Sequence, residues 1–266
     1  MIRDITIGQY YPANSIIHRL DPRVKLMATV VFIVSVFLIH DLVGFLIATA
    51  ALGACIWLSK VPVRYMLKGL KVIFIILIFT VLLNMMFTPG REIFRFYFIR
   101  VTWEGVILAG KTTMRLIYLI VGSTIMTLTT TPNHLTDGLE KALSPLKKLR
   151  FPVHELSMTM SIALRFIPIL LEETDKIMKA QQARCADFES GNLIHRVKNL
   201  IPVLVPLFIS AIRRANDLAM AMEARCYHGG AGRTKMKPLI YNRRDKIGYA
   251  VVIAYLILWI VLICVF

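Results

Sequence analysis

Acidic residues are scarce in this sequence, which has 16 Asp and Glu against 32 Lys and Arg and a formal net charge of +16. Cysteine is rare too, and the four cysteines form no CxxC pair, which argues against a small secreted domain held by disulfides. The chain is nevertheless 57% hydrophobic, well above the roughly 45–50% of a soluble domain. These features indicate a membrane protein whose basic surfaces contact anionic lipid headgroups or acidic partners.

Patterns that would carry catalysis or metal binding are missing as well. We find no set of Ser, His and carboxylate, no paired carboxylates in a membrane segment and no HExxH motif. The six histidines repeat no recognised ligand spacing, and His195 and His228 fit polar positions near helix ends better than metal ligands. We therefore expect that this chain is not an enzyme and binds no cofactor and no metal.

One motif argues for nucleotide binding, because residues 105–112 read GVILAGKT and satisfy the phosphate-loop pattern GxxxxGK[ST]. The residues between its two glycines are mostly bulky and apolar, and no alternation of strands and helices surrounds them. We interpret the segment as the start of a membrane helix, with Lys111 and Arg115 reaching toward the outer interface.

Apolar segments of about the length that a membrane span requires suggest about five transmembrane helices. The first opens with Asp21-Pro22, a favourable N-cap followed by proline at the first helical position. Several basic residues precede this span, and others lie in residues 60–71 with no acidic residue among them. Because Lys and Arg near span ends favour the cytoplasmic side, both stretches should be cytoplasmic and the loop of residues 91–103 should lie outside. The expected spans are residues 26–40, 42–59, 72–90, about 104–130 and 247–266.

From residue 132 onward, charges of both signs alternate with short apolar runs, which favours helices packed beneath the membrane over further spans. We expect three helices there, at about residues 133–149, 153–187 and 195–227, with kinks at Pro168, Pro202 and Pro206. The whole chain is predicted to be all-α. Its expected domains are a membrane domain at residues 1–131, a cytoplasmic module at 132–243 and a final span at 244–266.

The two long module helices end alike. Ala183-Arg184-Cys185 closes one and Ala224-Arg225-Cys226 closes the other. Small Ala and Cys side chains permit close approach, while each arginine offers a planar, permanently charged fork to a partner's carboxylate. These six residues are the candidate binding site. Two solvated arginines in a chance repeat of common residues are the alternative.

The sequence resembles the transmembrane T component of energy-coupling factor (ECF) transporters, the family that includes the cobalt-transport protein CbiQ. The resemblance extends nearly end to end, and the paired motif of the family usually reads Ala-Arg-Gly where this chain has Cys185 and Cys226. A glycine there adopts a left-handed helix end at little cost. The matching segments are GQY at residues 8–10, SIIHRLDPRVKL at 15–26, ALSPL at 142–146, ALRFIP at 163–168 and EE at 172–173.

The resemblance implies a multi-pass coupling subunit of an ABC-type importer in the plasma membrane of a prokaryote. Its arginine ends would dock into two ATPase subunits, which bind the ATP. The module would hold a membrane S component, which binds a vitamin or a related micronutrient. A cobalt- or nickel-type T component of the same family is the alternative.

Two other classes of protein would show different sequence patterns. An independent transporter with its own substrate site should show paired repeats, broken helices or ionisable residues at mid-membrane. A nucleic-acid-binding protein should cluster basic residues with aromatic ones, whereas the charges of this module are mixed, so we expect no nucleic-acid partner. The module is rich in methionine. These side chains could belong to an ordinary packed core or to a surface that binds several different S components.

Overall fold

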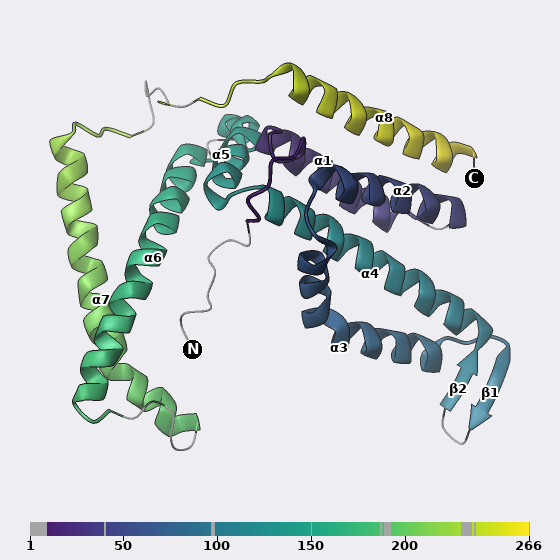
Figure 1. Cartoon of the computed structure of the whole chain (residues 1–266), viewed down its shortest axis with the longest axis horizontal. Coiled ribbons are helices and arrows are strands. Elements are labelled where there is room, and N and C mark those ends of the chain that lie inside the picture. Colours follow the sequence, from purple (N-terminus) through teal and green to yellow (C-terminus); the bar gives the residue numbers. More distant parts are fainter. Residues whose placement is uncertain are drawn as a thin grey trace. The chain divides into compact units, whose positions relative to one another are not determined.

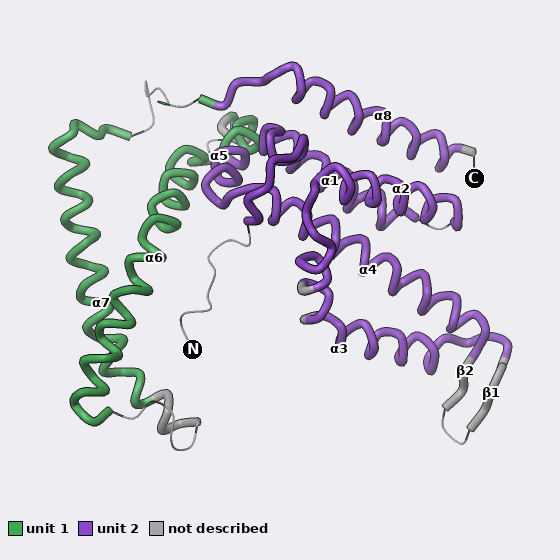
Figure 2. The backbone as a smooth tube through the Cα atoms, in the orientation of Figure 1, with its two compact units in different colours: residues 1–7, 140–238 green, residues 8–139, 239–266 purple. Residues whose placement is uncertain are grey.

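The computed structural model describes residues 10–39, 41–96, 99–149, 151–186, 188, 193–229, 236 and 238–265. Gly8 and Gln9, which contribute to the family resemblance, lie outside this part. The chain forms two compact units, shown in Figure 2. Unit 1 comprises residues 1–7 and 140–238, and unit 2 comprises residues 8–139 and 239–266. The sequence-based domain limits at 131 and 243 rest on placement in the membrane rather than on compactness, and they stay a prediction.

Unit 2 is a set of helices, and its first helix begins as expected. Pro22 occupies the first turn, and the Asp21 carboxylate accepts a hydrogen bond from the Arg23 N–H at 2.9 Å. Such a cap satisfies one of the free N–H groups of the first turn. The helices of unit 2 are α1 (Pro22–Phe37), α2 (Leu42–Ser59), α3 (Val63–Phe87), α4 (Trp103–Thr129), most of α5 (Pro132–Ala142) and α8 (Arg243–Val265) (Figure 1).

Four or five helices in the described residues are long and apolar enough to cross a membrane, which confirms the predicted all-α membrane fold. They are not the expected set. The helix α1 has 16 residues and is shorter than a typical span, whereas α6 (Val153–Ala183), expected in the cytoplasmic module, is sufficiently long and apolar. The helix α3 is bent by 61° between Lys71 and Ile73, and its two parts can count as one span.

The segment expected as an outer loop contains an antiparallel hairpin of β1 (Glu92–Phe96) and β2 (Ile99–Thr102). The residues that join the two strands lie outside the described part. Thr102 ends the hairpin and begins α4, because its hydroxyl accepts a hydrogen bond from the Gly105 N–H at 3.2 Å. A short two-stranded addition of this kind connects α3 to α4 without changing the helical character of unit 2.

The hydrophobic core of unit 2 lies among α1, α2 and α4, with Met66 of α3 and Trp259 of α8 packed into it. Glycines let these helices approach closely. A Cβ atom on Gly122 would lie 2.8 Å from the Phe32 ring, and one on Gly44 would lie 3.0 Å from the Trp259 ring. Small residues at helix contacts are typical of membrane bundles, where packing rather than water exclusion favours association.

Unit 1 contains the end of α5, the 3₁₀ helix η2 (Ser144–Leu149), α6 and α7 (Leu193–Ala224). The helix expected at 133–149 is therefore wrong as one element, because α5 ends at Ala142. Pro145 explains the break, since a proline disfavours the helical conformation of the residue before it. Pro168 lies inside α6, and Pro202 and Pro206 lie inside α7.

Candidate functional site

The first candidate motif forms a defined end of α6. Arg184 is the C-cap, and Cys185 follows it with φ of 64°. The Cys185 N–H donates to the Gln182 carbonyl at 2.9 Å, and the N–H of the next residue donates to the Gln181 carbonyl at 3.0 Å. These two bonds are the Schellman arrangement, which satisfies carbonyl groups left free at a helix end.

The second motif repeats this geometry at the end of α7. Cys226 has φ of 54°. Its N–H donates to the Glu223 carbonyl at 2.8 Å, and the Tyr227 N–H donates to the Met222 carbonyl at 3.1 Å. The three-residue repeat in the sequence is therefore also a repeated three-dimensional structure, rather than a chance match of common residues in unrelated conformations.

The two cysteines show how these helices end without the glycine of the family motif. Three non-glycine residues of the described chain have positive φ, namely Lys60, Cys185 and Cys226, and each follows the end of a helix. The left-handed conformation costs an L-residue roughly 1–2 kcal/mol. The chain accepts this cost at both ends, where the Schellman bonds form.

All six candidate residues are exposed: Ala183, Arg184, Cys185, Ala224, Arg225 and Cys226. Within the part of the chain that the structure describes, neither Arg184 nor Arg225 forms an ion pair or a side-chain hydrogen bond. Each guanidinium group therefore keeps its full set of donors for a partner's carboxylate. The small side chains beside each arginine leave it accessible.

The two arginine ends lie at opposite ends of the α6–α7 pair. Glu173 of α6 contacts Arg214 of α7, and Gln181, further along α6, donates to the carbonyl of Pro202, further back along α7. The helices therefore run antiparallel through their contact, and Figure 1 shows them crossing there. Arg184 and Arg225 each lie 11 residues beyond the Glu173–Arg214 pair, which corresponds to about 16 Å of helix.

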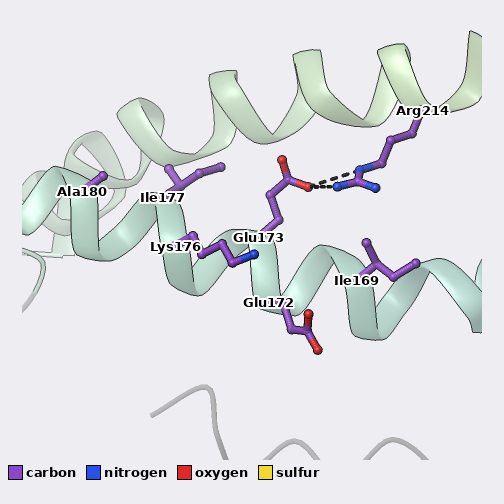
Figure 3. A pocket seen from close by; sticks show the side chains of 7 residues that line it. All are labelled: Ile169, Glu172, Glu173, Lys176, Ile177, Ala180 and Arg214. Atoms are coloured by element: carbon purple, nitrogen blue, oxygen red, sulfur yellow. Dashed lines mark hydrogen bonds and ion pairs between the residues drawn. The ribbon is translucent and has the colours of Figure 1, made fainter. Parts of the chain in front are cut away.

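The contact at the crossing is polar. One oxygen of the Glu173 carboxylate accepts from the Arg214 Nε and NH2 groups at 3.2 and 2.6 Å, and the other accepts from the Ser210 hydroxyl at 2.6 Å. Beside it lies a groove of about 410 Å³, shown in Figure 3 with Glu173 reaching across to Arg214. Its lining residues are Ile169, Glu172, Glu173, Lys176, Ile177, Ala180 and Arg214.

In unit 2, Lys25 lies at the centre of a buried polar cluster that sequence reasoning missed. The Lys25 ammonium donates to the His18 carbonyl at 3.3 Å, to the Thr129 carbonyl at 2.9 Å and to the Thr130 hydroxyl at 3.3 Å. Lys25 is only 8% exposed. It joins the start of α1 to the end of α4, where a positive charge also complements the helix dipole.

Asp245 completes the cluster from the start of α8. Its carboxylate accepts from the backbone N–H groups of Asp21 at 2.8 Å and Asn242 at 2.7 Å. His18 lies at the edge, where burial, opposed by a backbone hydrogen bond with Tyr11, lowers its pKa. The only signal in the sequence was the SIIHRLDPRVKL segment itself, which holds three of these residues. The contacts of Asp21 with Asp245 and of Lys25 with Thr129 join residues more than 100 positions apart.

The segment that matches the phosphate-loop pattern lies within α4, whose helix runs from Trp103 to Thr129. Its backbone N–H groups point along the helix and do not form the loop that holds phosphates. Arg115, expected at the outer interface, donates to the Ile39 carbonyl just beyond α1 at 2.7 Å. No group of three or more His, Cys, Asp or Glu residues in the described ranges has a geometry suited to a metal ion.

Comparison with known proteins agrees with these features. The sequence model of a family described as cobalt transport protein (CbiQ) matches residues 13–236. Three proteins named energy-coupling factor transporter transmembrane protein EcfT match nearly the whole chain. The one from Clostridium kluyveri is 54% identical over 93% of this chain and 92% of its own length. Those from Bacillus subtilis and Lactococcus lactis are 48% and 46% identical, over 92% and 98% of this chain and 93% and 98% of their own lengths.

These matches confirm the resemblance drawn from the ordered motifs of the sequence, and they extend through both units of the structure. The chain therefore belongs to the cobalt transport protein family, as a transmembrane component of the energy-coupling factor transporter type.

Proposed function

We propose that this chain is a coupling subunit of an ATP-driven importer and catalyses no reaction itself. The observation that supports this most directly is the pair of equivalent, exposed helix ends, each with an arginine that has no ion pair in the described chain. Two equivalent ends suit two copies of one kind of partner, or two related partners. In a transporter of this family type these partners are two ABC-type ATPase subunits, so ATP binds there and this chain holds no cofactor.

Each arginine end binds a groove on one ATPase. A guanidinium group can form two parallel hydrogen bonds with a carboxylate. Losing such a desolvated pair typically costs about 2–5 kcal/mol of binding free energy, which is at least about 25-fold in affinity. Exposed Ala183 and Ala224 let the partner surface approach each helix end closely.

A membrane S component binds the apolar side of α6 and α7. The face of α7 that α6 leaves uncovered is rich in exposed apolar residues, namely Ile201, Leu204, Val205, Phe208 and Ile212. An amphipathic helix with an uncovered apolar face suits the surface of a membrane or of a membrane partner. We place the α6–α7 pair on the cytoplasmic side of a prokaryotic cell membrane, because basic residues concentrate in the segments that flank the first spans.

Movement of the ATPase pair changes the distance between the two arginine ends and thereby the surface that the S component contacts. Transmission over this length requires an element with two arrangements that both partners can favour. The solute is a vitamin or a related micronutrient that the S component selects. The description of the matching family as cobalt transport protein supports a cobalt- or nickel-type T component as the second candidate.

The test is transport by reconstituted complexes that carry Arg184→Ala, Arg225→Ala or both. Each single change is expected to weaken ATPase binding at least about 25-fold if the arginine is desolvated in the complex. Arg→Lys at either position keeps the charge but loses the planar fork, and it should restore function only in part.

The matched control is Arg213→Ala, because Arg213 is exposed on α7 and has no ion pair within the described chain. Membrane insertion of every variant is measured first. Wild-type uptake and ATPase binding by the double arginine variant would remove the basis of the site assignment.

A further inference from the structure

One spacing relates two features of the α6–α7 pair. Arg225 follows Arg184 by 41 residues, and Arg214 follows Glu173 by the same 41 residues. Residues with this spacing therefore occupy equivalent positions in α6 and α7. Glu173 therefore contacts its own equivalent, Arg214. The two arginine ends lie equally far from this ion pair along their helices.

Ser210 and Arg214 satisfy both oxygens of the Glu173 carboxylate, and we call these three residues the crossing contact. The Arg214 Nε and NH2 groups donate to one oxygen of the Glu173 carboxylate, and the Ser210 hydroxyl donates to the other oxygen. Hydrogen bonds between charged groups are shorter and stronger than neutral ones. A shift of either helix by one residue would separate these atoms.

Few described residues of α6 and α7 are buried. The residues of both helices are mostly exposed or half-buried, and Val203, at 3% exposed, is the one hydrophobic residue of α7 that is buried among those described. The groove of about 410 Å³ lies beside the crossing contact. Away from the crossing, the hydrogen bond from Gln181 to the Pro202 carbonyl is exposed and 3.3 Å long.

From this geometry we propose that Glu173, Ser210 and Arg214 are positioning residues that set the distance between the two arginine ends. The role of those ends as ATPase contacts rests on the function proposed above. The crossing contact touches neither partner in this scheme. It acts by holding α6 and α7 in one register and one crossing angle, so that movement at one end reaches the other.

The first experiment measures the distance between the helix ends in the full chain alone. Nitroxide labels are attached to Cys185 and Cys226, which are exposed, in a chain that also carries Cys55→Ala and Cys264→Ala. Pulsed electron spin resonance then measures the distance between the two labels. Glu173→Gln keeps the shape but places an amide against Arg214. It is expected to broaden the distance distribution about twofold. Glu172→Gln, which removes the same charge from an exposed neighbour, should leave the distribution unchanged.

The second experiment measures solute uptake per ATP hydrolysed in reconstituted complexes with natural cysteines. Glu173→Gln is expected to keep the ATPase subunits bound but to lower this ratio about three- to tenfold. The exchanged pair Glu173→Arg with Arg214→Glu should recover most of the ratio, which a variant that merely misfolds would not do. Glu172→Gln is again the control.

The two experiments separate this inference from the proposed function. An unchanged distance distribution in Glu173→Gln, or an unchanged ratio of uptake to ATP hydrolysis, overturns the positioning role. A broadened distribution together with a wild-type chain that binds no ATPase subunits would instead refute the proposed function and leave the geometry of the crossing contact intact.

Discussion

Lys25→Met tests whether the polar cluster of unit 2 stabilises the fold. The change keeps an unbranched side chain but removes the donors to the Thr129 carbonyl and the Thr130 hydroxyl, which are both buried. A buried acceptor left without a donor costs about 1–3 kcal/mol, so two of them predict a loss of about 2–6 kcal/mol. That is a large share of the roughly 5–15 kcal/mol that separates folded from unfolded domains.

Thermal unfolding of the purified chain in detergent, followed by circular dichroism, measures this loss. A fall of about 2–6 kcal/mol corresponds to a decrease in Tm of roughly 4–24 °C for a chain of this size. Lys71→Met is the matched control, because Lys71 is an exposed lysine within α3 and its loss should change Tm little. A Lys25→Met variant that unfolds at the wild-type temperature would refute the argument.

Three further predictions concern ATP, the helix ends and the S component. The chain alone is expected neither to bind nor to hydrolyse ATP, since residues 105–112 are helical, and labelled ATP whose binding is abolished by Lys111→Ala would contradict this. Glycine in place of Cys185 or Cys226 should raise the free energy of unfolding by about 0.5–1 kcal/mol, because it removes the cost of the left-handed conformation but adds the conformational entropy that glycine loses on folding. A lower Tm would show that the cysteines are unstrained. Two S components should compete for one complex, because methionine-rich surfaces repack easily. Retention of one S component against any excess of another would exclude sharing.

The sequence was sufficient to predict most of the helices and several of their ends. Asp21-Pro22 indicated the start of α1, and the Asp21 carboxylate does cap that helix. The interval of residues 42–59 matches α2 as observed. Such features depend on residues within one or two turns of each other, so their physical causes can be read from neighbours along the chain.

Packing explains what the sequence did not reveal. The contacts of Lys25 with Thr129 and Thr130 join segments separated by more than 100 residues. Neither segment alone has an unusual number of polar residues that would have indicated the contact. The Glu173–Arg214 pair was equally hidden, although the 41-residue repeat of the arginine motifs was visible, because a repeat does not state how two helices cross. The left-handed cysteines also needed the structure, since only the observed hydrogen bonds show that the glycine-type helix end persists.

The equal separation of Arg184 and Arg225 from the Glu173–Arg214 pair has a mechanical consequence. Considered as a lever, the α6–α7 pair has two arms of about 16 Å each, with the ion pair as its fulcrum. Equal and opposite displacements of the two ends turn the helices about the fulcrum and leave it in place, whereas displacement of one end alone must translate it. A symmetric pair of partners therefore generates rotation at the crossing, and an asymmetric pair generates sliding.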